Sequence, residues 1–233
     1  MKKKRNVLLS LIFPERCVYC GARVPGGTPV CEKCRKALPR IEEKVCPKCG
    51  RGKKVCDCRG RENYFDGIAA PFYFSGCVRN GLHIFKFRNS TSGAGEFARE
   101  MAETLKQRFG DIAFDFITEV PVSRKSLRAR GYNQSALIAK ELSSLTGIPY
   151  KSGVIEKIYE TRAQHGLPGY LRTGNLSGVY DLPEPSAVKD KTVLLCDDIS
   201  TSGETLNECA KMLWLGGAKS IYCITLALTP VRK

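Results

Sequence analysis

The sequence has no apolar run long enough to cross a lipid bilayer, which takes about 20 residues in a helix. The run near the start, residues 7–13, is only seven residues long. It follows a basic segment, as in a secretory signal, but it lacks a small-residue cleavage site and Pro14 comes directly after it. We expect a cytoplasmic protein in which this run packs as a short helix, with docking at the inner face of the membrane as the alternative.

Histidine is scarce, and internal repeats and low-complexity tracts are missing. The 2 histidines are interpreted as a structural residue in an apolar helix, His83, and a solvated loop residue, His165. A charged fraction of 26% with a hydrophobic fraction of 42% indicates a globular protein. A length of 233 residues is enough for one substantial α/β domain and a small additional module.

Cysteine, by contrast, is abundant and unevenly placed, because eight of the 12 cysteines fall within residues 17–58. They form three CxxC pairs and one CxC pair, a spacing at which two thiolates can bind one tetrahedral zinc ion from a tight turn. The predicted ligands are Cys17, Cys20, Cys31, Cys34, Cys46, Cys49, Cys56 and Cys58. The alternative, a disulfide framework, would need an oxidising compartment. We predict a cysteine-rich zinc module similar to a double zinc ribbon over residues 1–60, and a second domain over residues 61–233.

The spacing leaves the number of zinc ions open: two ions with ligands in chain order, two cross-braced ions, or one ion with a degenerate second site.

The first segment is also strongly basic. Residues 1–60 hold 16 Lys and Arg against 5 Asp and Glu, whereas residues 61–233 hold 22 against 18. A basic module favours nucleic acid as a partner, and a merely solvated basic surface is the alternative. Structural zinc contributes ~10–16 kcal/mol in small peptides, so we expect a chelator to loosen residues 1–60 and leave the second domain folded.

The second domain alternates between apolar strands and amphipathic helices. Strands are expected at 66–75, 116–122, 193–196 and 221–228, and helices at 78–87, 95–109, 132–146 and from 206 to Gly216. This order predicts an α/β fold with a parallel sheet, right-handed crossovers and helices on both faces. The four outlying cysteines, Cys77, Cys196, Cys209 and Cys223, are interpreted as core residues and not as nucleophiles.

The stretch from Val193 to Thr205 is the most informative part of the chain. Its first four residues are apolar, as in a strand buried on both faces, and ligands of parallel sheets bind at the carboxyl ends of such strands. Two adjacent carboxylates, Asp197 and Asp198, then offer acceptors for the two hydroxyls of a ribose, with help from Mg²⁺. The hydroxyl-rich loop and helix start that follow favour a phosphate. We predict a sugar-phosphate site, and an ordinary acidic turn before an N-capped helix is the alternative.

Two further segments follow no clean periodicity and are expected to be loops at this site. Residues 121–131 carry four cations, Arg124, Lys125, Arg128 and Arg130, which would balance a pyrophosphate; a solvated helix start is the alternative. Residues 160–175 are glycine-rich and long for a connector, so they are predicted to form a lid that excludes water, or else a surface loop.

The carboxylate pair and its loop resemble the phosphoribosyl-pyrophosphate (PRPP) motif of type I phosphoribosyltransferases, which implies a sheet of that type here. The resemblance implies that Asp197 and Asp198 hold the ribose 2′- and 3′-hydroxyls. It places the 5′-phosphate on Thr201, Ser202, Gly203, Glu204 and Thr205. Purine-salvage members carry an acid/base aspartate where this chain has Thr201, so proton transfer by that route is not expected.

The whole layout resembles the ComF family, in which a zinc module precedes a phosphoribosyltransferase-like domain. The resemblance rests on residues 11–14, the paired cysteines, residues 130–134, Arg162 with Gln164, Arg172 with Asn175, and the PRPP motif. It implies that the pocket also includes Arg130, Asn133, Gln134, Arg162, Gln164, Arg172 and Asn175. It further implies a role in natural transformation, with single-stranded DNA as ligand and a DNA-uptake helicase or membrane channel as partner.

Three functions are compatible with these residues. The first is an accessory protein of DNA uptake that binds PRPP with Mg²⁺ and single-stranded DNA on its basic surface. The second is an active phosphoribosyltransferase that transfers phosphoribose from PRPP to an unidentified acceptor, with Arg124, Arg128 and Arg162 stabilising the leaving pyrophosphate. The third is a PRPP sensor without chemistry. The basic zinc module favours the first, and the absence of a general base at Thr201 disfavours the second.

Overall fold

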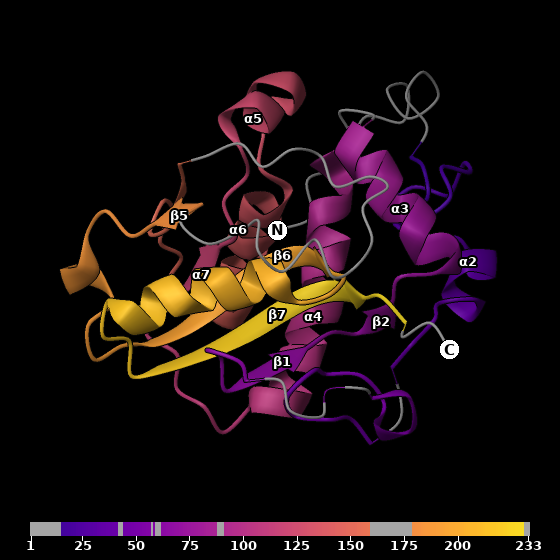
Figure 1. Ribbon diagram of the computed structural model, residues 1–233. Helices are drawn as coiled ribbons and strands as arrows, with labels where there is room; N and C mark the ends of the chain where they lie inside the picture. The colour runs from indigo at the N-terminus through magenta and orange to yellow at the C-terminus, as the bar shows by residue number, and fades with distance from the viewer. Residues whose placement is uncertain are drawn as a thin grey trace.

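The computed structural model describes residues 15–41, 44–56, 58, 62–87, 91–158 and 179–230, and its centre is a parallel sheet (Figure 1). Within these residues the sheet has five strands in the order β1-β7-β6-β3, and β2 also pairs with β7. The strands are β1 (Gly67–Ala69), β2 (Phe72–Tyr73), β3 (Phe116–Glu119), β6 (Thr192–Ser200) and β7 (Ser220–Leu228). All five pair in parallel, which confirms the predicted sheet.

The two central strands are buried on both faces because nearly all their residues are apolar. Alternate side chains point to opposite faces, so Val193 and Leu195 join one layer of the core while Leu194 and Cys196 join the other. The helices α3 (Gly76–Phe87), α4 (Ala94–Phe109) and α6 (Gln134–Thr146) cover the second face. Helix α7 (Glu204–Leu215) covers the first.

Shorter elements fill the edges of the molecule. They are α2 (Glu32–Lys36), α5 (Arg124–Arg130), the hairpin of β4 (Glu156–Lys157) with β5 (Tyr180–Asp181), and the 3₁₀ turns η1 (Lys53–Val55), η2 (Thr91–Gly93) and η4 (Pro185–Ala187). None of the helices within the described ranges is both long and apolar enough to span a membrane.

The cysteine-rich module packs directly on the α/β domain. The ring of Tyr19 is fully buried and lies 6.3 Å from the ring of Phe72 and 5.6 Å from that of Phe97, centroid to centroid. The Asn80 side chain on α3 donates a hydrogen bond to the Tyr19 carbonyl at 2.8 Å. The module and the second domain therefore share one hydrophobic core.

Three sequence predictions need correction. The carboxylates of Asp197 and Asp198 lie within β6 and not beyond its end, because strand pairing continues to Ser200. Within residues 121–131 the structure has the alternative, a helix, instead of a loop: α5 begins after Ser123, whose hydroxyl accepts from the Ser126 amide, and ends at Gly131 in the left-handed region. The strand expected at 66–75 is split into β1 and β2.

The outlying cysteines are mostly core residues, as predicted. Cys196, Cys209 and Cys223 are fully buried, and burial raises the pKa of each thiol well above its usual range. Cys77 differs, because it is only half-buried and its sulfur lies 3.6 Å from the Ala37 carbonyl oxygen.

Candidate functional site

The carboxylate pair of Asp197 and Asp198 lies in the carboxyl-terminal half of β6, and both residues are buried. The Oδ1 atom of Asp197 accepts hydrogen bonds from the Ser135 hydroxyl and from the Asp198 amide, each at 2.8 Å. Ser135 is in the first turn of α6, so this helix fixes one carboxylate from across the sheet. The first acid of the pair is thus oriented before any ligand binds.

The second acid is paired with a cation. The Lys86 ammonium, in the last turn of α3, lies 2.5 Å from Oδ2 of Asp198. Both side chains are largely shielded from water, which strengthens the attraction. A ligand that needs this carboxylate must therefore share it with Lys86 or displace the ammonium.

Burial raises the pKa of Asp197 to about 7, and the neighbouring charge of Asp198 adds to the rise. The Ser135 hydroxyl and Lys86 act in the opposite direction, because they stabilise the ionised carboxylate. The carboxyl group of Asp197 is therefore mostly ionised only above about pH 7.

The loop after β6 prepares the start of α7. Gly203 has φ +86°, a left-handed conformation that favours glycine, and it precedes the first helical residue, Glu204. Thr201 and Ser202 are exposed, and the Ser202 hydroxyl accepts from the Glu204 amide at 3.5 Å. The first amides of a helix have no partner within the helix, so this end of α7 suits an anion.

Arg51, from the cysteine-rich module, holds the same loop from outside. Its Nη2 donates to the Thr201 carbonyl at 2.7 Å, and its Nε donates to the Thr229 carbonyl at 2.9 Å. One guanidinium therefore joins the residue after β6 to the residue after β7. Since only Gly50 separates Arg51 from Cys49, the module's third CxxC pair, Cys46 and Cys49, is directly linked to this loop.

The predicted pocket residues of α5 and α6 have different environments. Arg124 and Arg128 are exposed on α5, whereas Arg130 donates to Gln134 Oε1 at 3.3 Å and stacks on the Phe87 ring. Gln134 is buried, and among the described residues its Nε2 has no hydrogen-bond partner.

Asn133 has a structural role, since it caps α6 through the Ser135 amide and donates to the Val120 carbonyl. The remaining predicted pocket residues, Arg162, Gln164, Arg172 and Asn175, lie outside the described residues, as does the expected lid at 160–175.

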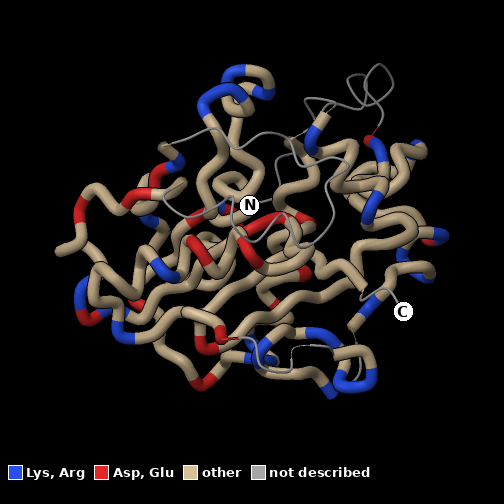
Figure 2. Tube along the Cα trace, viewed as in Figure 1, with Lys and Arg blue, Asp and Glu red and all other residues tan. Residues whose placement is uncertain are grey.

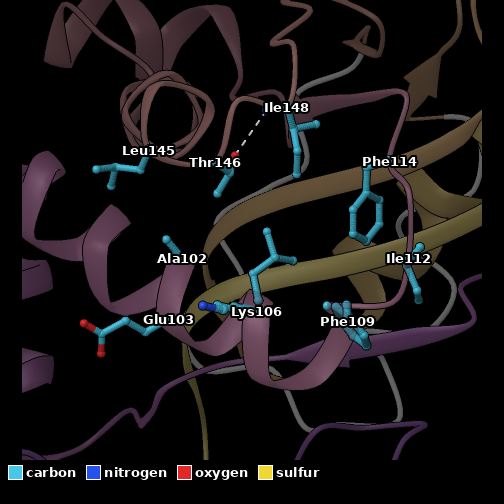
Figure 3. Close-up of a pocket in the computed structure, with 11 residues that line it drawn as sticks. Ala102, Glu103, Lys106, Phe109, Ile112, Phe114, Leu145, Thr146 and Ile148 are labelled. Atoms are coloured by element: carbon cyan, nitrogen blue, oxygen red, sulfur yellow. Dashed lines mark hydrogen bonds between the residues drawn. The ribbon is translucent and has the colours of Figure 1, made fainter.

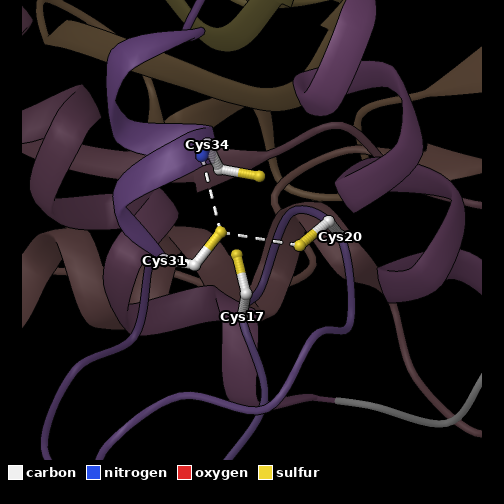
Figure 4. Close-up of side chains that lie close together, drawn as sticks. All are labelled: Cys17, Cys20, Cys31 and Cys34. Atoms are coloured by element: carbon white, nitrogen blue, oxygen red, sulfur yellow. Dashed lines mark hydrogen bonds between the residues drawn. The ribbon is translucent and has the colours of Figure 1, made fainter.

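The first four cysteines of the module form one cluster, the first cluster: Cys17, Cys20, Cys31 and Cys34. Their sulfurs face a common centre and lie within 4.8 Å of one another (Figure 4). Tetrahedral zinc with Zn–S bonds near 2.3 Å needs sulfurs roughly 3.8 Å apart, and the Cys20–Cys31 distance is 3.7 Å. Burial alone would raise the pKa of Cys17, but backbone amides of Cys31, Cys20 and Tyr19 lower it to about 7, which favours the thiolate.

The other four cysteines form the second cluster: Cys46, Cys49, Cys56 and Cys58. Cys46 and Cys58 lie 3.4 Å apart, and Cys49 and Cys56 lie 3.6 Å apart, sulfur to sulfur. Although burial raises it, the Cys49 amide and neighbouring thiols lower the pKa of Cys46 to about 7. The eight cysteines thus group in chain order and not in a cross-braced pattern, and both clusters fit structural zinc.

A separate cavity of about 480 Å³ lies between the ends of α4 and α6 (Figure 3). The carboxyl ends of α4 and α6 form its walls, with Phe109, Phe114 and Leu145 among the apolar lining residues. Because these helices end where β3 begins, this cavity is on the amino-terminal side of the sheet, away from Asp197 and Asp198.

The fold and the clusters define a phosphoribosyltransferase-type α/β protein with a cysteine-rich module. A family model described as "Phosphoribosyl transferase domain" matches residues 91–233, and one described as "Double zinc ribbon domain" matches residues 8–65. The chain belongs to the phosphoribosyl transferase domain family, with a double zinc ribbon before that domain.

Curated relatives match nearly the full length. DNA utilization protein YhgH of Escherichia coli is 27% identical over 230 residues, covering 94% of this chain and 99% of that protein. Competence protein F of Haemophilus influenzae is 25% identical over 225 residues, covering 92% and 97%. Competence protein ComFC of Streptococcus pneumoniae is 26% identical over 205 residues, covering 84% and 86%. The resemblance to the ComF family is thereby confirmed.

Among solved structures, one similar chain is a purine phosphoribosyltransferase from Pyrococcus horikoshii. It is 25% identical, with a TM-score of 0.35 and coverage of 59% of this chain and 75% of that chain.

Sequence reasoning missed three residues that contact the site: Lys86, Ser135 and Arg51. Ser135 directly follows the residues 130–134 that carry the family resemblance, so its neighbours gave a signal. Lys86 and Arg51 are 112 and 150 positions away from their partners Asp198 and Thr201 in the sequence, and nothing in their local pattern indicates the contact.

Proposed function

We propose that the chain binds PRPP at the carboxyl end of β6 and handles single-stranded DNA on its basic surface, as an accessory protein of natural transformation. The observation that carries the proposal is the buried pair Asp197 and Asp198, placed just before a glycine loop at the start of α7. The relatives named for competence and for DNA utilization support the DNA half.

Each part of the site has a role in this proposal. The two carboxylates accept hydrogen bonds from the ribose 2′- and 3′-hydroxyls, and residues 201–205 bind the 5′-phosphate with hydroxyls and main-chain amides. Lys86 leaves Asp198 and turns to the pyrophosphate as the ribose enters. Mg²⁺ accompanies PRPP, because carboxylate and phosphate oxygens are the donors it prefers. The buried Gln134 amide supplies a further donor.

Titration calorimetry with PRPP and Mg²⁺ tests the pocket. The double variant Asp197→Asn with Asp198→Asn keeps the shape of both side chains but removes their charge, and we expect PRPP affinity to fall by about 100-fold or more. Glu184→Gln, at an exposed carboxylate in the turn before η4, is the matched control and should leave affinity unchanged. Equal affinities in the double variant and the control would contradict the pocket assignment.

Catalytic transfer of phosphoribose is the second candidate function. It is favoured by Lys86 beside the carboxylate pair and Arg130 beside Gln134, since cations there would stabilise a leaving pyrophosphate. Incubation with PRPP and Mg²⁺, with and without single-stranded DNA, separates the functions by pyrophosphate release. Release that needs DNA supports transfer in DNA handling, release without DNA supports an independent enzyme, and no release supports binding or sensing alone.

The remaining parts of the proposal rest on the family resemblance. They are a cytoplasmic location, with docking at the inner face of the membrane, and a DNA-uptake helicase or membrane channel as partner. Co-purification of the full chain with such a partner from competent cells is the measurement that tests them.

A further inference from the structure

The outer face of α7 carries an exposed aromatic pair that the PRPP pocket does not use. The rings of Tyr64 and Trp214 lie 5.5 Å apart, centroid to centroid, at an interplanar angle of 52°. The Lys211 ammonium lies 5.8 Å from the centre of the Tyr64 ring. Tyr64 is 38% exposed and Trp214 is 56% exposed. We refer to Tyr64, Lys211 and Trp214 as the aromatic ledge.

Hydrogen bonds hold the aromatic ledge in position. The Tyr64 amide donates to Asn207 Oδ1 at 2.8 Å, and Asn207, Lys211 and Trp214 follow one another at helical spacing on one face of α7. On the other side of Tyr64, the Asn63 side chain donates to the Lys48 carbonyl at 3.0 Å. The two rings are therefore presented to water by a rigid support.

The aromatic ledge continues into a cationic cleft. A cavity of about 200 Å³ lies between the second cluster and the loop after β6. Its lining residues include Lys48, Arg51, Asn63 and Ser202. Asn63 lines the cleft, and the next residue, Tyr64, belongs to the ledge. Lys and Arg residues are frequent along the second cluster's segment as well as on α5 (Figure 2).

We infer that the aromatic ledge is a stacking platform for the bases of single-stranded nucleic acid, with the backbone phosphates directed toward Lys211 and Lys48. This inference rests on the DNA half of the proposed function and names the surface involved. Exposed aromatic rings beside cations bind single strands without sequence preference, because every base has a π face. A duplex keeps its bases stacked inside and cannot use such rings.

Trp214 gives a direct readout because it is the only tryptophan in the chain. Titration of the full protein with a short oligothymidylate should quench its fluorescence in a saturable way, and a duplex of equal length should quench it much less. With a labelled oligonucleotide, fluorescence anisotropy should show that the affinity of Tyr64→Ala is lower than that of the wild type by about tenfold or more. Lys211→Gln should bind the oligonucleotide more weakly, and the slope of log affinity against log salt concentration should be smaller by about one. Lys219→Gln, at an exposed lysine beyond α7, is the matched control.

The outcomes separate this inference from the proposed function. If the wild type binds the oligonucleotide and Tyr64→Ala binds it equally well, the ledge assignment is wrong while DNA binding stands. If the wild type binds no oligonucleotide, the DNA half of the proposed function fails as well. If Trp214 fluorescence changes with protein concentration alone, the ledge is a contact between two copies of the chain and the inference is overturned. PRPP titration of Tyr64→Ala should match the wild type, which shows that the pocket is intact.

Discussion

The two cysteine clusters offer the same four thiols each, yet they support different parts of the molecule. The first cluster flanks Tyr19, whose buried ring packs on Phe72 and Phe97 in the hydrophobic core. The cysteines of the second cluster are half-buried, and the adjacent Arg51 donates a hydrogen bond to the loop after β6, at the Thr201 carbonyl. This difference indicates that the first cluster supports the shared core, whereas the second positions the loop after β6.

A glycine allows close backbone contact at each of the two places where a cysteine cluster packs on the α/β domain. A Cβ added to Gly81 on α3 would lie 2.9 Å from the Tyr19 ring and 3.0 Å from the Tyr19 Cα, so helix and module touch backbone to backbone. A Cβ added to Gly50 would lie 2.6 Å from the Ile68 carbonyl oxygen, and its φ of +68° also disfavours other residues. Both cysteine clusters therefore pack closely on the α/β domain, although they support different parts of it.

Loss of the first cluster should have the largest effect. We expect Cys17→Ser with Cys34→Ser to prevent stable folding, because structural zinc contributes ~10–16 kcal/mol in small peptides. That is of the same size as the roughly 5–15 kcal/mol stability of a typical domain. Soluble yield and the near-ultraviolet circular dichroism of the whole chain measure this. Cys77→Ser is the matched control, since Cys77 lies beside the cluster but is not a member. A folded α/β domain in the double variant would remove the distinction between the clusters.

This expectation reverses the one drawn from composition. A basic, cysteine-rich segment predicts an independent module that a chelator loosens alone. The packing of Tyr19 predicts instead that removing the first zinc opens the core beneath α3 and α4.

Loss of the second cluster should leave the fold but weaken the pocket. For Cys46→Ser with Cys58→Ser we expect native circular dichroism, one zinc per chain instead of two, and PRPP affinity lowered on the order of tenfold to hundredfold. The reason is that Arg51 loses its support and releases the Thr201 carbonyl. Elemental analysis and calorimetry on the same preparation check the prediction. Unchanged PRPP affinity at one zinc per chain would refute the link.

Arg51→Ala removes the link between the second cluster and the loop after β6 but keeps all four zinc ligands of that cluster. Hydrogen bonds from a charged donor contribute ~1.5–3 kcal/mol, so PRPP affinity should fall by about tenfold with both zinc ions retained. Lys53→Ala, another cation of the same segment, should bind PRPP like the wild type. Equal losses in the two variants would point to general charge and not to the position of the loop.

The smallest expected effect is on thermal stability, and it comes from a substitution in the carboxylate pair that leaves both cysteine clusters unchanged. The folded pKa of Asp197, about 7, lies above its ordinary value of 3.8, so its protonated form stabilises the fold at low pH, and this contribution is lost progressively as pH rises from 3.8 through about 7. Asp197→Asn should therefore raise the melting temperature at pH 8, by about 2–4 °C for each kcal/mol of this contribution, and change it little at a pH below 3.8. Scanning calorimetry at the two pH values measures the difference. An equal shift at both would assign the effect to packing and not to charge.

The long helices could be predicted from the sequence because periodic apolar residues and a stop signal agree. The helix expected at 95–109 is α4, and the one expected at 132–146 is α6, which ends at Gly147 with φ +76° as a left-handed stop. Helix α5 was expected only as the alternative, a solvated helix start, since a seven-residue charged segment shows no apolar period although Ser123 and Gly131 mark its ends.

The candidate site could be predicted only where its residues are neighbours in the sequence. Asp197, Asp198 and the loop after β6 are contiguous, so their pattern predicted a ligand. Their supports come from elsewhere in the fold: Lys86 from α3 and Arg51 from the zinc module. Such contacts depend on the order of strands and helices in space, which no local pattern contains.

The position of Tyr19 in the core also has a consequence during synthesis. The first cluster is translated before Phe97, against which Tyr19 packs. At about 5–20 residues per second, the interval between Cys34 and Phe97 lasts several seconds, during which these thiols lack their supporting surface. We expect the supply of zinc to the nascent chain, more than zinc added after purification, to determine how much active protein a cell accumulates.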